Sequence, residues 1–551
     1  MRTPIAHSAR KNYPLQTYEA HVRGVCERAG KYAAEAECYS VKANGILSAI
    51  VRDSALLHDL GKLEERNQSV LCEQSRRRRH LPVDHTDAGS AALQKMGSGC
   101  AAMLVYSHHQ GLPDLSTEFA ARGCSIFRNG NAEVRAETDA ALPALLRQHE
   151  ALFPRKPNKE VQAYDGDPAV FLRMALSCLA DADHGDTAAA FGQTEKAMPE
   201  LRPQERLAAL DHYVSKFGET DERSSLRREL YQSCRSAEAH SGFSVCGSPV
   251  GSGKTTAVMA HLLEQACKRN ARRIFVVLPY TSIIRQSVDI YRKALVLPGE
   301  TPEDVVAELH SRADFEDIET RYLTALWRAP IVVTTAVAFF ETLSSHNPAA
   351  LRRLHELPGS LIFVDEAHSA LPIRLLPLAW HWMNVLADEW SCYWVLASGS
   401  LVRYWELQPL SGLSMPQPEI AELVRPDLQR ELSRYESSRI TFRWREKPIG
   451  RKELPKWVQE APGPRLLILN TVQSAAVIAA DMAAEFGQTH VEHLSTALTP
   501  EDRGNTIDRI RRRLADPDDA DWTLVATSCV EAGVDFSFRT GFREISSLLS
   551  L

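Results

Sequence analysis

The stretch FSVCGSPVGSGKTT, residues 243–256, decides the fold of the larger part of this chain. A short apolar run, expected as a strand, leads into a glycine-rich loop, and a helical segment follows over 255–268. In this order a loop can place backbone N–H groups around a phosphate at the positive end of a helix. Ser248 stands where the full phosphate-loop pattern has its first glycine, so a glycine-rich turn without a ligand remains the alternative.

This loop and a later acidic pair predict a site for a nucleotide and its magnesium ion. Lys254 would reach the β and γ phosphates, and Thr255 would hold Mg²⁺. Asp365 and Glu366 follow an apolar run; Asp365 would bind Mg²⁺ through water and Glu366 would polarise the attacking water. Such a pair is often structural, but the loop upstream favours the functional interpretation. The expected nucleotide-binding residues in this part of the chain are Ser248, Gly251, Gly253, Lys254, Thr255, Thr256 and Asp365.

Short apolar runs alternate with helical stretches from about residue 240 onward. Continuous apolar strands between helices indicate a parallel sheet that is covered on both faces. One set of runs is 243–247, 273–279, 330–335, 361–366 and 392–398, and a second set is 465–470, 490–495 and 523–528. We therefore expect two RecA-like α/β lobes, over 233–425 and 426–551, with a hinge within the proline-containing and charged stretch 403–440.

The first third of the chain follows a different pattern. Alanine, leucine and glutamate recur at helical spacing, with few β-branched runs, and this predicts an all-α domain over residues 1–188. Segments 15–30, 46–58, 86–96 and 168–182 have the spacing of amphipathic helices. Residues 189–232 are polar and are expected to form a partly helical linker.

Composition bounds the class of protein. With 551 residues, 44% hydrophobic and 24% charged, the chain suits several globular domains, and a disordered or fibrous protein is excluded. No apolar run approaches the roughly 18 residues of a membrane span, so no membrane partner is expected. A net charge of −6 neither requires nor excludes nucleic acid. Eleven cysteines without a CxxC pair are expected as reduced thiols in a cytoplasmic protein.

The motifs of the two lobes resemble those of superfamily-two helicases, both in order and in placement at strand ends. The matching stretches are LPYTSIIRQ (278–286), TTAVAFFETL (334–343), DEAH (365–368), SGS (398–400) and ATSCVEAGVDFSF (526–538). The resemblance implies that residues 279–286 and 334–335 touch the nucleic-acid backbone and that Ser398 and Ser400 couple hydrolysis to lobe movement. In the second lobe it assigns contacts with DNA and nucleotide to Thr527, Gly533 and Asp535.

Five histidines and several aspartates of the helical domain fall in short motifs. These are His21 in a helical segment, HDLGK (58–62), HTDAG (85–89), SHHQG (107–111) and LADADHGDT (179–187). A lone histidine in a helix is usually packed or exposed, but imidazoles combined with carboxylates are a ligand set for transition metals. A bridging carboxylate can hold two ions about 3.5–4 Å apart, which stabilises the attacking and leaving oxygens of a hydrolysis.

This series resembles the HD metal-dependent phosphohydrolases, and more closely their nuclease branch. The resemblance implies one metal held by His21, His58, Asp59 and Asp181, and another held by Asp59, His85, His108 and His109. Asp183 competes with Asp181 for the first position. Lys62 could neutralise a scissile phosphate, with a solvated lysine as the alternative, so Asp59, Lys62 and Glu366 are the expected catalytic residues. One or two divalent ions are expected, and Mn, Fe, Co, Ni and Mg all remain open.

An HD domain followed by superfamily-two lobes resembles the helicase-nuclease of type I CRISPR systems over nearly the whole chain. The resemblance implies recruitment by an RNA-guided surveillance complex and nicking of the displaced strand of an R-loop. It further implies ATP-dependent 3′ to 5′ unwinding while the HD site degrades single-stranded DNA. That family continues with an arginine-bearing motif, whereas this sequence ends at TGFREISSLLSL (540–551), so an incomplete second lobe and weak ATP hydrolysis are expected.

Two other functions stay open from the sequence. The helical domain could hydrolyse a small nucleotide phosphate while the lobes serve DNA repair. The chain could also be a catalytically inactive module that binds DNA or a protein–RNA complex. Assays of single-stranded DNA against nucleotides, each with added divalent metal, separate these functions from a nuclease.

Overall fold

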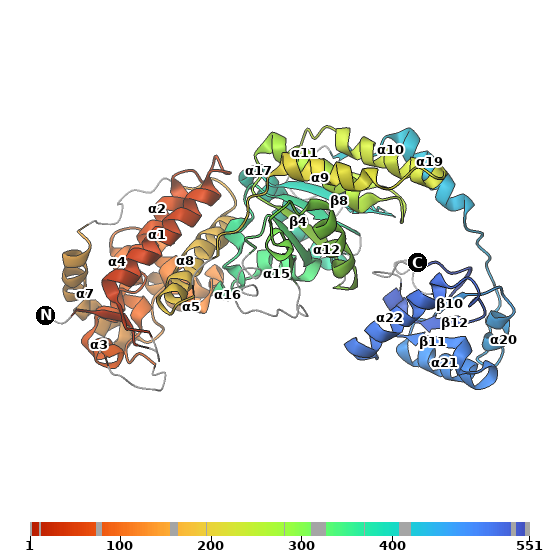
Figure 1. Cartoon of the computed structure of the whole chain (residues 1–551). Coiled ribbons are helices and arrows are strands. Elements are labelled where there is room, and N and C mark those ends of the chain that lie inside the picture. Colours follow the sequence, from red (N-terminus) through yellow and green to blue (C-terminus); the bar gives the residue numbers. More distant parts are fainter. Residues whose placement is uncertain are drawn as a thin grey trace. The chain divides into compact units, whose positions relative to one another are not determined.

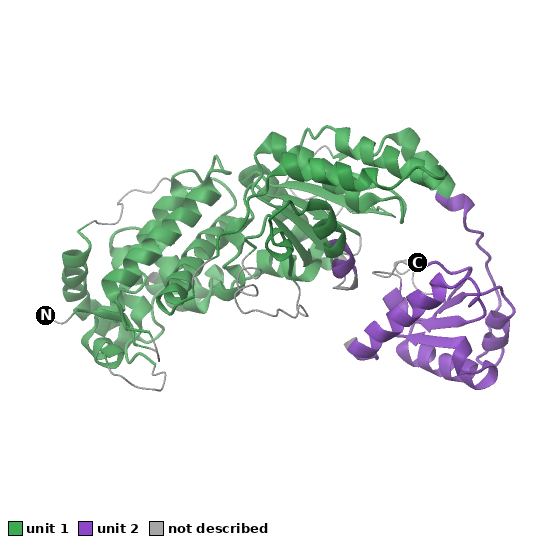
Figure 2. Cartoon of the chain, viewed as in Figure 1, with its two compact units in different colours: residues 1–279, 288–435 green, residues 280–287, 436–551 purple. Residues whose placement is uncertain are grey.

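The structure, a computed structural model, describes residues 3–9, 13–72, 80–154, 163–193, 196–279, 281–309, 327–367, 370–399, 401–406, 420–530 and 536–545. Several predicted motif positions lie outside these ranges, namely Tyr280, His368, Ser400 and residues 531–535, which include Gly533 and Asp535. The chain divides into two compact units (Figure 2). One comprises residues 1–279 and 288–435, and the other comprises residues 280–287 and 436–551.

The N-terminal part of the first unit is a helical domain (Figure 1). Its helices are α1 (Tyr18–Glu37), α2 (Ile46–Leu57), α3 (Glu65–Cys72), α4 (His85–Lys95), α5 (Gly99–Gln110), α6 (Leu115–Arg122), α7 (Ala132–Leu152) and α8 (Pro168–Ala190). Helix α1 packs on α2 and α8, and α5 packs on α2, α4 and α8. Small residues permit close approach, since a Cβ on Gly89 of α4 would lie 2.0 Å from the carbonyl oxygen of Leu57.

The expected all-α domain needs one correction. Strands β1 (Ile5–His7) and β2 (Gln16–Thr17) pair antiparallel, and β2 runs directly into α1. Thr17 then caps α1 by accepting a hydrogen bond from the backbone N–H of Ala20 at 3.2 Å. Strands of three and two residues are too short to produce a periodic pattern, so the sequence did not reveal them.

The rest of the first unit is built on a parallel sheet. Its strands are β3 (Phe243–Gly247), β4 (Ile274–Leu278), β5 (Val306–Leu309), β6 (Ile331–Thr335), β7 (Leu361–Val364), β8 (Tyr393–Ser398) and β9 (Ala421–Glu422). They lie in the order β5-β6-β4-β7-β8-β3-β9, and every neighbouring pair is parallel. The five central strands coincide with predicted apolar runs, and the two edge strands were not predicted. This is the first lobe.

Helices alternate with these strands along the chain. They include α11 (Lys254–Arg269), α12 (Thr281–Leu295), α13 (Pro302–Val305), α15 (Ala336–Ser344), α16 (Pro348–Leu351), α17 (Leu376–Trp390) and α19 (Pro426–Ser438). Two more, α9 (Pro203–Ser215) and α10 (Glu222–Ser236), belong to the stretch expected as a linker. Both pack on α11, so this stretch is part of the first lobe rather than a free connection.

The second unit holds a smaller parallel sheet, the second lobe. Strands β10 (Arg465–Ile468), β11 (Val491–Leu494), β12 (Thr523–Ala526) and β13 (Thr540–Arg543) lie in the order β11-β12-β10-β13. Leu467 and Ile468 point to opposite faces and belong to separate apolar clusters. Helices α20 (Leu454–Gln459), α21 (Val472–Phe486) and α22 (Pro500–Ala515) accompany the sheet. Thr527 follows β12 and is buried.

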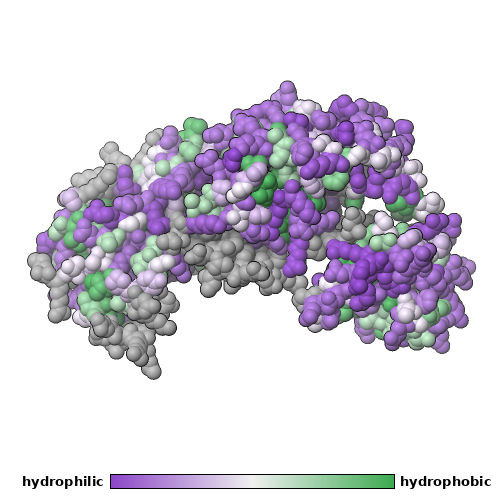
Figure 3. Space-filling model, in the orientation of Figure 1, coloured by the Kyte–Doolittle hydropathy of each residue, from purple (hydrophilic) through white to green (hydrophobic). Residues whose placement is uncertain are grey.

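The visible surface is largely hydrophilic, with scattered hydrophobic residues (Figure 3). None of the helices in the described ranges is long and apolar enough to cross a membrane.

Candidate metal centre and nucleotide site

Asp59 lies at the centre of a histidine cluster in the helical domain. It follows His58, the C-cap of α2, and precedes the short 3-10 helix η1 (Leu60–Leu63). Its Oδ2 atom lies 3.1 Å from Nε2 of His21 and 3.3 Å from Nε2 of His58. Its Oδ1 atom lies 3.6 Å from Nε2 of His85. The two carboxylate oxygens therefore face two different groups of histidines.

The second group joins the start of α4 to the end of α5. Nε2 of His109 lies 3.0 Å from Nε2 of His85, and the rings of His108 and His109 are 4.0 Å apart. Ligand atoms of Asp59, His85, His108 and His109 all lie within 4.8 Å of one another. The same holds for His21, His58 and Asp59. Asp59 belongs to both groups, which is the arrangement of a bridging carboxylate.

Backbone carbonyls orient two of these imidazoles. Nδ1 of His58 lies 2.8 Å from the carbonyl oxygen of Ala55, and Nδ1 of His108 lies 2.6 Å from that of Val105. A carbonyl oxygen can only accept, so each Nδ1 carries the proton. Each Nε2 then keeps its lone pair for the interior of the cluster, as metal-binding histidines require.

Asp181 does not lie in this cluster, which corrects the expected ligand set. Its carboxylate accepts hydrogen bonds from Arg328 at 2.6 Å and from Arg352 at 2.7 Å, both residues of the first lobe. Asp183 approaches the cluster instead, with Oδ1 3.4 Å from Nε2 of His21. Two residues advance about 200° around an α-helix, so the two aspartates of α8 face opposite ways.

Asp186 is a site residue that the sequence analysis missed. Its Oδ2 atom lies 2.7 Å from Nδ1 of His21 and also accepts from Nε2 of Gln16 at 2.7 Å. Gly24 leaves the space for this contact, because a Cβ there would lie 1.9 Å from Oδ1 of Asp186. The spacing of Asp183 and Asp186, one helical turn apart, was the available signal.

Lys62 reaches into the cluster and not into solvent. Its side chain is buried, and Nζ lies 2.6 Å from Oδ2 of Asp59. The alternative of a solvated lysine is thereby excluded. Lys62 belongs to η1, since α2 ends at Leu57 and the chain changes helix type before it continues.

Charge and burial set the ionisation of the cluster. Burial disfavours the carboxylate form of Asp59, yet Lys62 and the hydrogen bond with His21 hold its pKa well below the usual value. Burial also disfavours a charged His21, but hydrogen bonds to three carboxylates raise its pKa to about 10. Burial lowers the pKa of His85 and of His108 to about 4, so both rings are neutral at pH 7.

Unsatisfied buried atoms mark where a cation fits. Among the described residues, Oδ1 of Asp59 and Nε2 of His108 are buried without a hydrogen-bond partner. Buried polar atoms in proteins normally have such a partner, and these two point to a ligand. Neutral imidazoles with carboxylates suit divalent transition metals, so the donor set fits one or two such ions.

The phosphate loop connects β3 to α11 in the first lobe. Gly251 and Gly253 have φ angles of 79° and 89°, a backbone conformation that favours glycine. Ser248 is not among the described residues with positive φ, and its Oγ lies 3.0 Å from Oγ of Ser252. A side chain is therefore tolerated where the full pattern has a glycine.

The acidic pair lies beside this loop, as predicted. Nζ of Lys254 is 3.7 Å from Oδ1 of Asp365 and 3.6 Å from Oε1 of Glu366. This Nζ is buried and has no hydrogen-bond partner within the described part of the chain, which suits the binding of a phosphate. Oγ of Ser398, at the end of β8, donates to Oε2 of Glu366 at 2.9 Å. Burial raises the pKa of Asp365 despite the nearby lysine.

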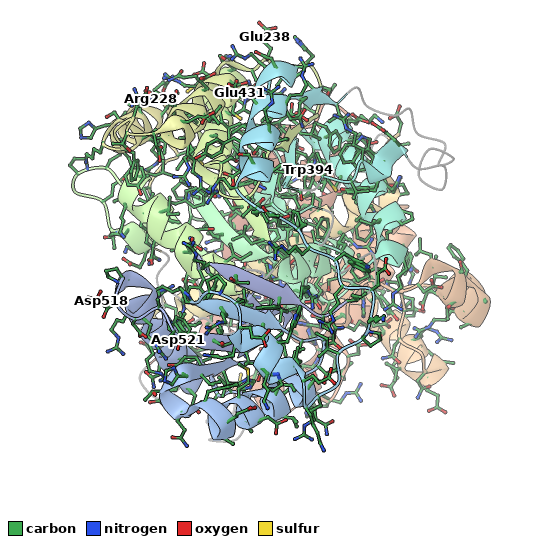
Figure 4. The ribbon with its side chains drawn as sticks, turned by 90° about the vertical axis from the view of Figure 1, so that its right-hand side faces the viewer. Arg228, Glu238, Trp394, Glu431, Asp518 and Asp521 are labelled. Carbon is green, nitrogen blue, oxygen red and sulfur yellow. The ribbon has the colours of Figure 1, made fainter. Side chains whose placement is uncertain are left out.

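Helix α10 supports the loop from the side. Nε of Arg227 donates to the carbonyl oxygen of Gly251 at 2.8 Å. Its neighbour Arg228 pairs with Glu219 at 2.6 Å and lies at the surface of the lobe, whereas Trp394 lies inside it (Figure 4). The stretch expected as a linker thus contributes a contact to the candidate nucleotide site.

Two family models match separate parts of the chain. Residues 231–374 match the DEAD/DEAH box helicase model. Residues 462–551 match the model described as CRISPR-associated nuclease/helicase Cas3, C-terminal. In these two parts the chain is similar to the Cas3 helicase family. The matched regions contain the phosphate loop, the acidic pair and the strands of the second lobe.

Individual relatives agree with this family. CRISPR-associated nuclease/helicase Cas3 of Haloferax volcanii is 22% identical over 403 residues, which cover 55% of this chain and 43% of the relative. The crystal structure of T. fusca Cas3-ATP matches with a TM-score of 0.63 at 17% identity, over 97% of this chain and 70% of that chain. A second crystal structure of T. fusca Cas3 matches with a TM-score of 0.64 at 17% identity, over 98% and 72%. Identities this low show the shared multidomain fold alone.

Proposed function

We propose that this chain belongs to the Cas3 helicase family and joins a metal-dependent nuclease, acting on single-stranded DNA, to an ATP-driven DNA helicase. The observation that carries the proposal is the double cluster around Asp59. His21, His58 and Asp183 lie on one side of its carboxylate, and His85, His108 and His109 lie on the other. Two cations that share a carboxylate suit an in-line displacement at a phosphodiester.

In the proposed nuclease, the protein residues mainly hold the divalent ions and orient the ligating side chains. Divalent ions held there would stabilise negative charge on the phosphate and activate water. Asp186 orients His21, and backbone carbonyls orient His58 and His108, so the lone pairs converge on the space beside Asp59. Lys62 now balances the charge of Asp59 and would turn to the scissile phosphate when DNA enters.

In the proposed helicase, Lys254 binds the β and γ phosphates, and Thr255 and Asp365 hold Mg²⁺. Glu366 polarises the attacking water, and its hydrogen bond from Ser398 fixes the orientation of the carboxylate. The family points to 3′ to 5′ movement that feeds single-stranded DNA to the HD site. It also points to recruitment by an RNA-guided surveillance complex to the displaced strand of an R-loop, in the cytoplasm.

Cleavage of single-stranded DNA with added Mn²⁺, Ni²⁺ or Mg²⁺ tests the nuclease. We expect cutting that stops with a chelator and is abolished by Asp59→Ala, because the bridging carboxylate is lost. Lys254→Ala should leave the cutting of single strands intact while it removes ATP binding, and it serves as the matched control. Unchanged cutting by Asp59→Ala would contradict the assignment. Hydrolysis of nucleotides without cutting of DNA would favour a nucleotide phosphohydrolase.

A further inference from the structure

One face of α8 is attached to the first lobe by a stripe of polar side chains. Nε of Arg173 donates to the carbonyl oxygen of Ser345 at 2.9 Å, and Oγ of Ser177 donates to that of Leu351 at 2.6 Å. Asp181, four residues later, pairs with Arg328 and Arg352. Residues spaced by four lie on one face of a helix, so this stripe runs along α8. We call residues 345–356 of the first lobe the docking segment.

The end of the stripe is a buried charge cluster. Asp181 has no exposed surface and pairs with Arg328. It also accepts two hydrogen bonds from Arg352 of the docking segment, from Nε at 2.9 Å and from Nη2 at 2.7 Å. Glu356, at the end of the same segment, pairs with Arg273 at 2.7 Å. Separating a buried ion pair leaves an uncompensated charge and is strongly unfavourable, so these pairs favour the observed position of the helix that carries Asp181.

The docking segment also holds the other ligand-bearing helix. The backbone N–H of Leu112, just beyond α5, donates to the carbonyl oxygen of His346 at 3.0 Å. A Cβ on Gly111 would lie 2.7 Å from the same oxygen, so the backbones of the two segments are in contact there. Helix α16, within the docking segment, contacts both α5 and α8 (Figure 1). Buried apolar residues of the helical domain and of the first lobe form one continuous core.

These contacts lie directly behind the histidine cluster. Asp183 and Asp186 face His21 from the side of α8 opposite Asp181, and His108 and His109 end the helix that the docking segment meets at His346. We propose that the docking segment of the helicase lobe is a structural part of the metal centre, with Asp181 as the positioning residue that sets α8. This inference rests on the proposed nuclease function.

The physical basis is the tolerance of a metal site for displacement. Ligand groups must be held within about 0.5 Å of their productive positions, by elements that are themselves locked in place. A turn of α8 that moved Asp181 away from its arginines would carry Asp183 away from His21 as well, because both belong to one rigid helix. The metal affinity of the helical domain should therefore depend on a lobe whose described residues include none of the candidate ligands.

Isothermal titration calorimetry of Mn²⁺ binding to the full chain tests this dependence. Asp181→Asn and Arg352→Met break the same ion pair from opposite sides, and both should weaken Mn²⁺ binding by about tenfold. Lys42→Met is the matched control, because it removes another ion pair between the helical domain and the first lobe, to Glu389 at 3.0 Å. It should leave Mn²⁺ binding unchanged. Thermal unfolding of each variant verifies that it is folded.

Several outcomes decide the matter. Folded Asp181→Asn and Arg352→Met variants with unchanged Mn²⁺ affinity would overturn the proposal, since the contacts would then serve adhesion alone. Loss of binding in Asp181→Asn but not in Arg352→Met would also overturn it, by making Asp181 a ligand. If neither variant folds, Ser177→Ala, which removes only hydroxyl contacts, carries the same expectation on a smaller scale. A wild type that binds Mn²⁺ but cuts no DNA would refute the nuclease and leave this comparison valid.

Discussion

At the scale of single residues, Asp186 controls how His21 faces the cluster. We expect Asp186→Ala to weaken divalent-metal binding by roughly 10–100-fold, because outer partners orient the ligating imidazole. Gln16→Ala is the control, since it removes the other hydrogen-bond partner of Asp186 and leaves the contact with His21. Metal titration of both variants measures the difference. Equal affinities in the two variants would show that Asp186 has no orienting role.

The phosphate loop gives a second prediction for a single side chain. Arg227→Ala should raise KM for ATP a fewfold, because it removes the hydrogen bond that holds the carbonyl of Gly251, and one hydrogen bond contributes about 0.5–1.5 kcal/mol net. Arg228→Ala removes a neighbouring arginine of the same helix, whose partner is Glu219. Steady-state ATPase assays should find no change for it. An equal rise in KM for ATP in both variants would indicate that the loss of a positive charge is the cause, and not the loss of the hydrogen bond to Gly251.

The two aspartates of α8 show what the sequence could and could not decide about the site. The five histidines and Asp59 were predicted because imidazole and carboxylate chemistry is visible in the residue types. The choice between Asp181 and Asp183 depends on which face of α8 meets α1, and that is set by packing against the lobe. Asp181 pairs with arginines that lie more than 140 residues away in the chain, and no local sequence pattern indicates that pairing.

At the scale of elements, helix α1 contains a matched pair of glycines. Alanine normally stabilises a helix interior by about 1 kcal/mol relative to glycine. Gly30→Ala should follow this rule, since its Cβ would meet no atom of the described residues within 4 Å. Gly24→Ala should instead destabilise the domain and weaken metal binding, because its Cβ would collide with Asp186. Thermal unfolding and metal titration of the two variants should move in opposite directions, and a shared stabilisation would contradict the packing argument.

Whole strands and helices show the same limit of prediction from sequence. The apolar runs at 243–247 and 393–398 became central strands, because strands buried on both faces need apolar residues at every position. The edge strands β5 and β13 contain charged or small residues and carry no such signal. The mostly polar sequences of α9 and α10 predict a linker, although one face of each helix packs on α11.

At the scale of the whole molecule, the helical domain and the first lobe share a core, and Glu356 lies in the charge cluster between them. It is buried and pairs with Arg272 at 3.0 Å and Arg273 at 2.7 Å. Burial disfavours its carboxylate form, yet the arginines hold its pKa well below 4.5. A lowered pKa adds stability above pH 4.5 that disappears as the pH falls further.

We therefore expect Glu356→Gln to cost about 3–5 kcal/mol in the unfolding free energy of the first unit at pH 7, because it leaves buried arginines without their carboxylate. The difference from wild type should shrink as the pH falls below 4.5, where the wild-type carboxylate loses its advantage. Glu137→Gln, which breaks an exposed pair with Arg66, should cost less than about 1 kcal/mol at either pH. Denaturant unfolding of the three proteins at pH 7 and pH 4 measures this. A difference that stays constant between the two pH values would mean that Glu356 stabilises the interface by shape and not by charge.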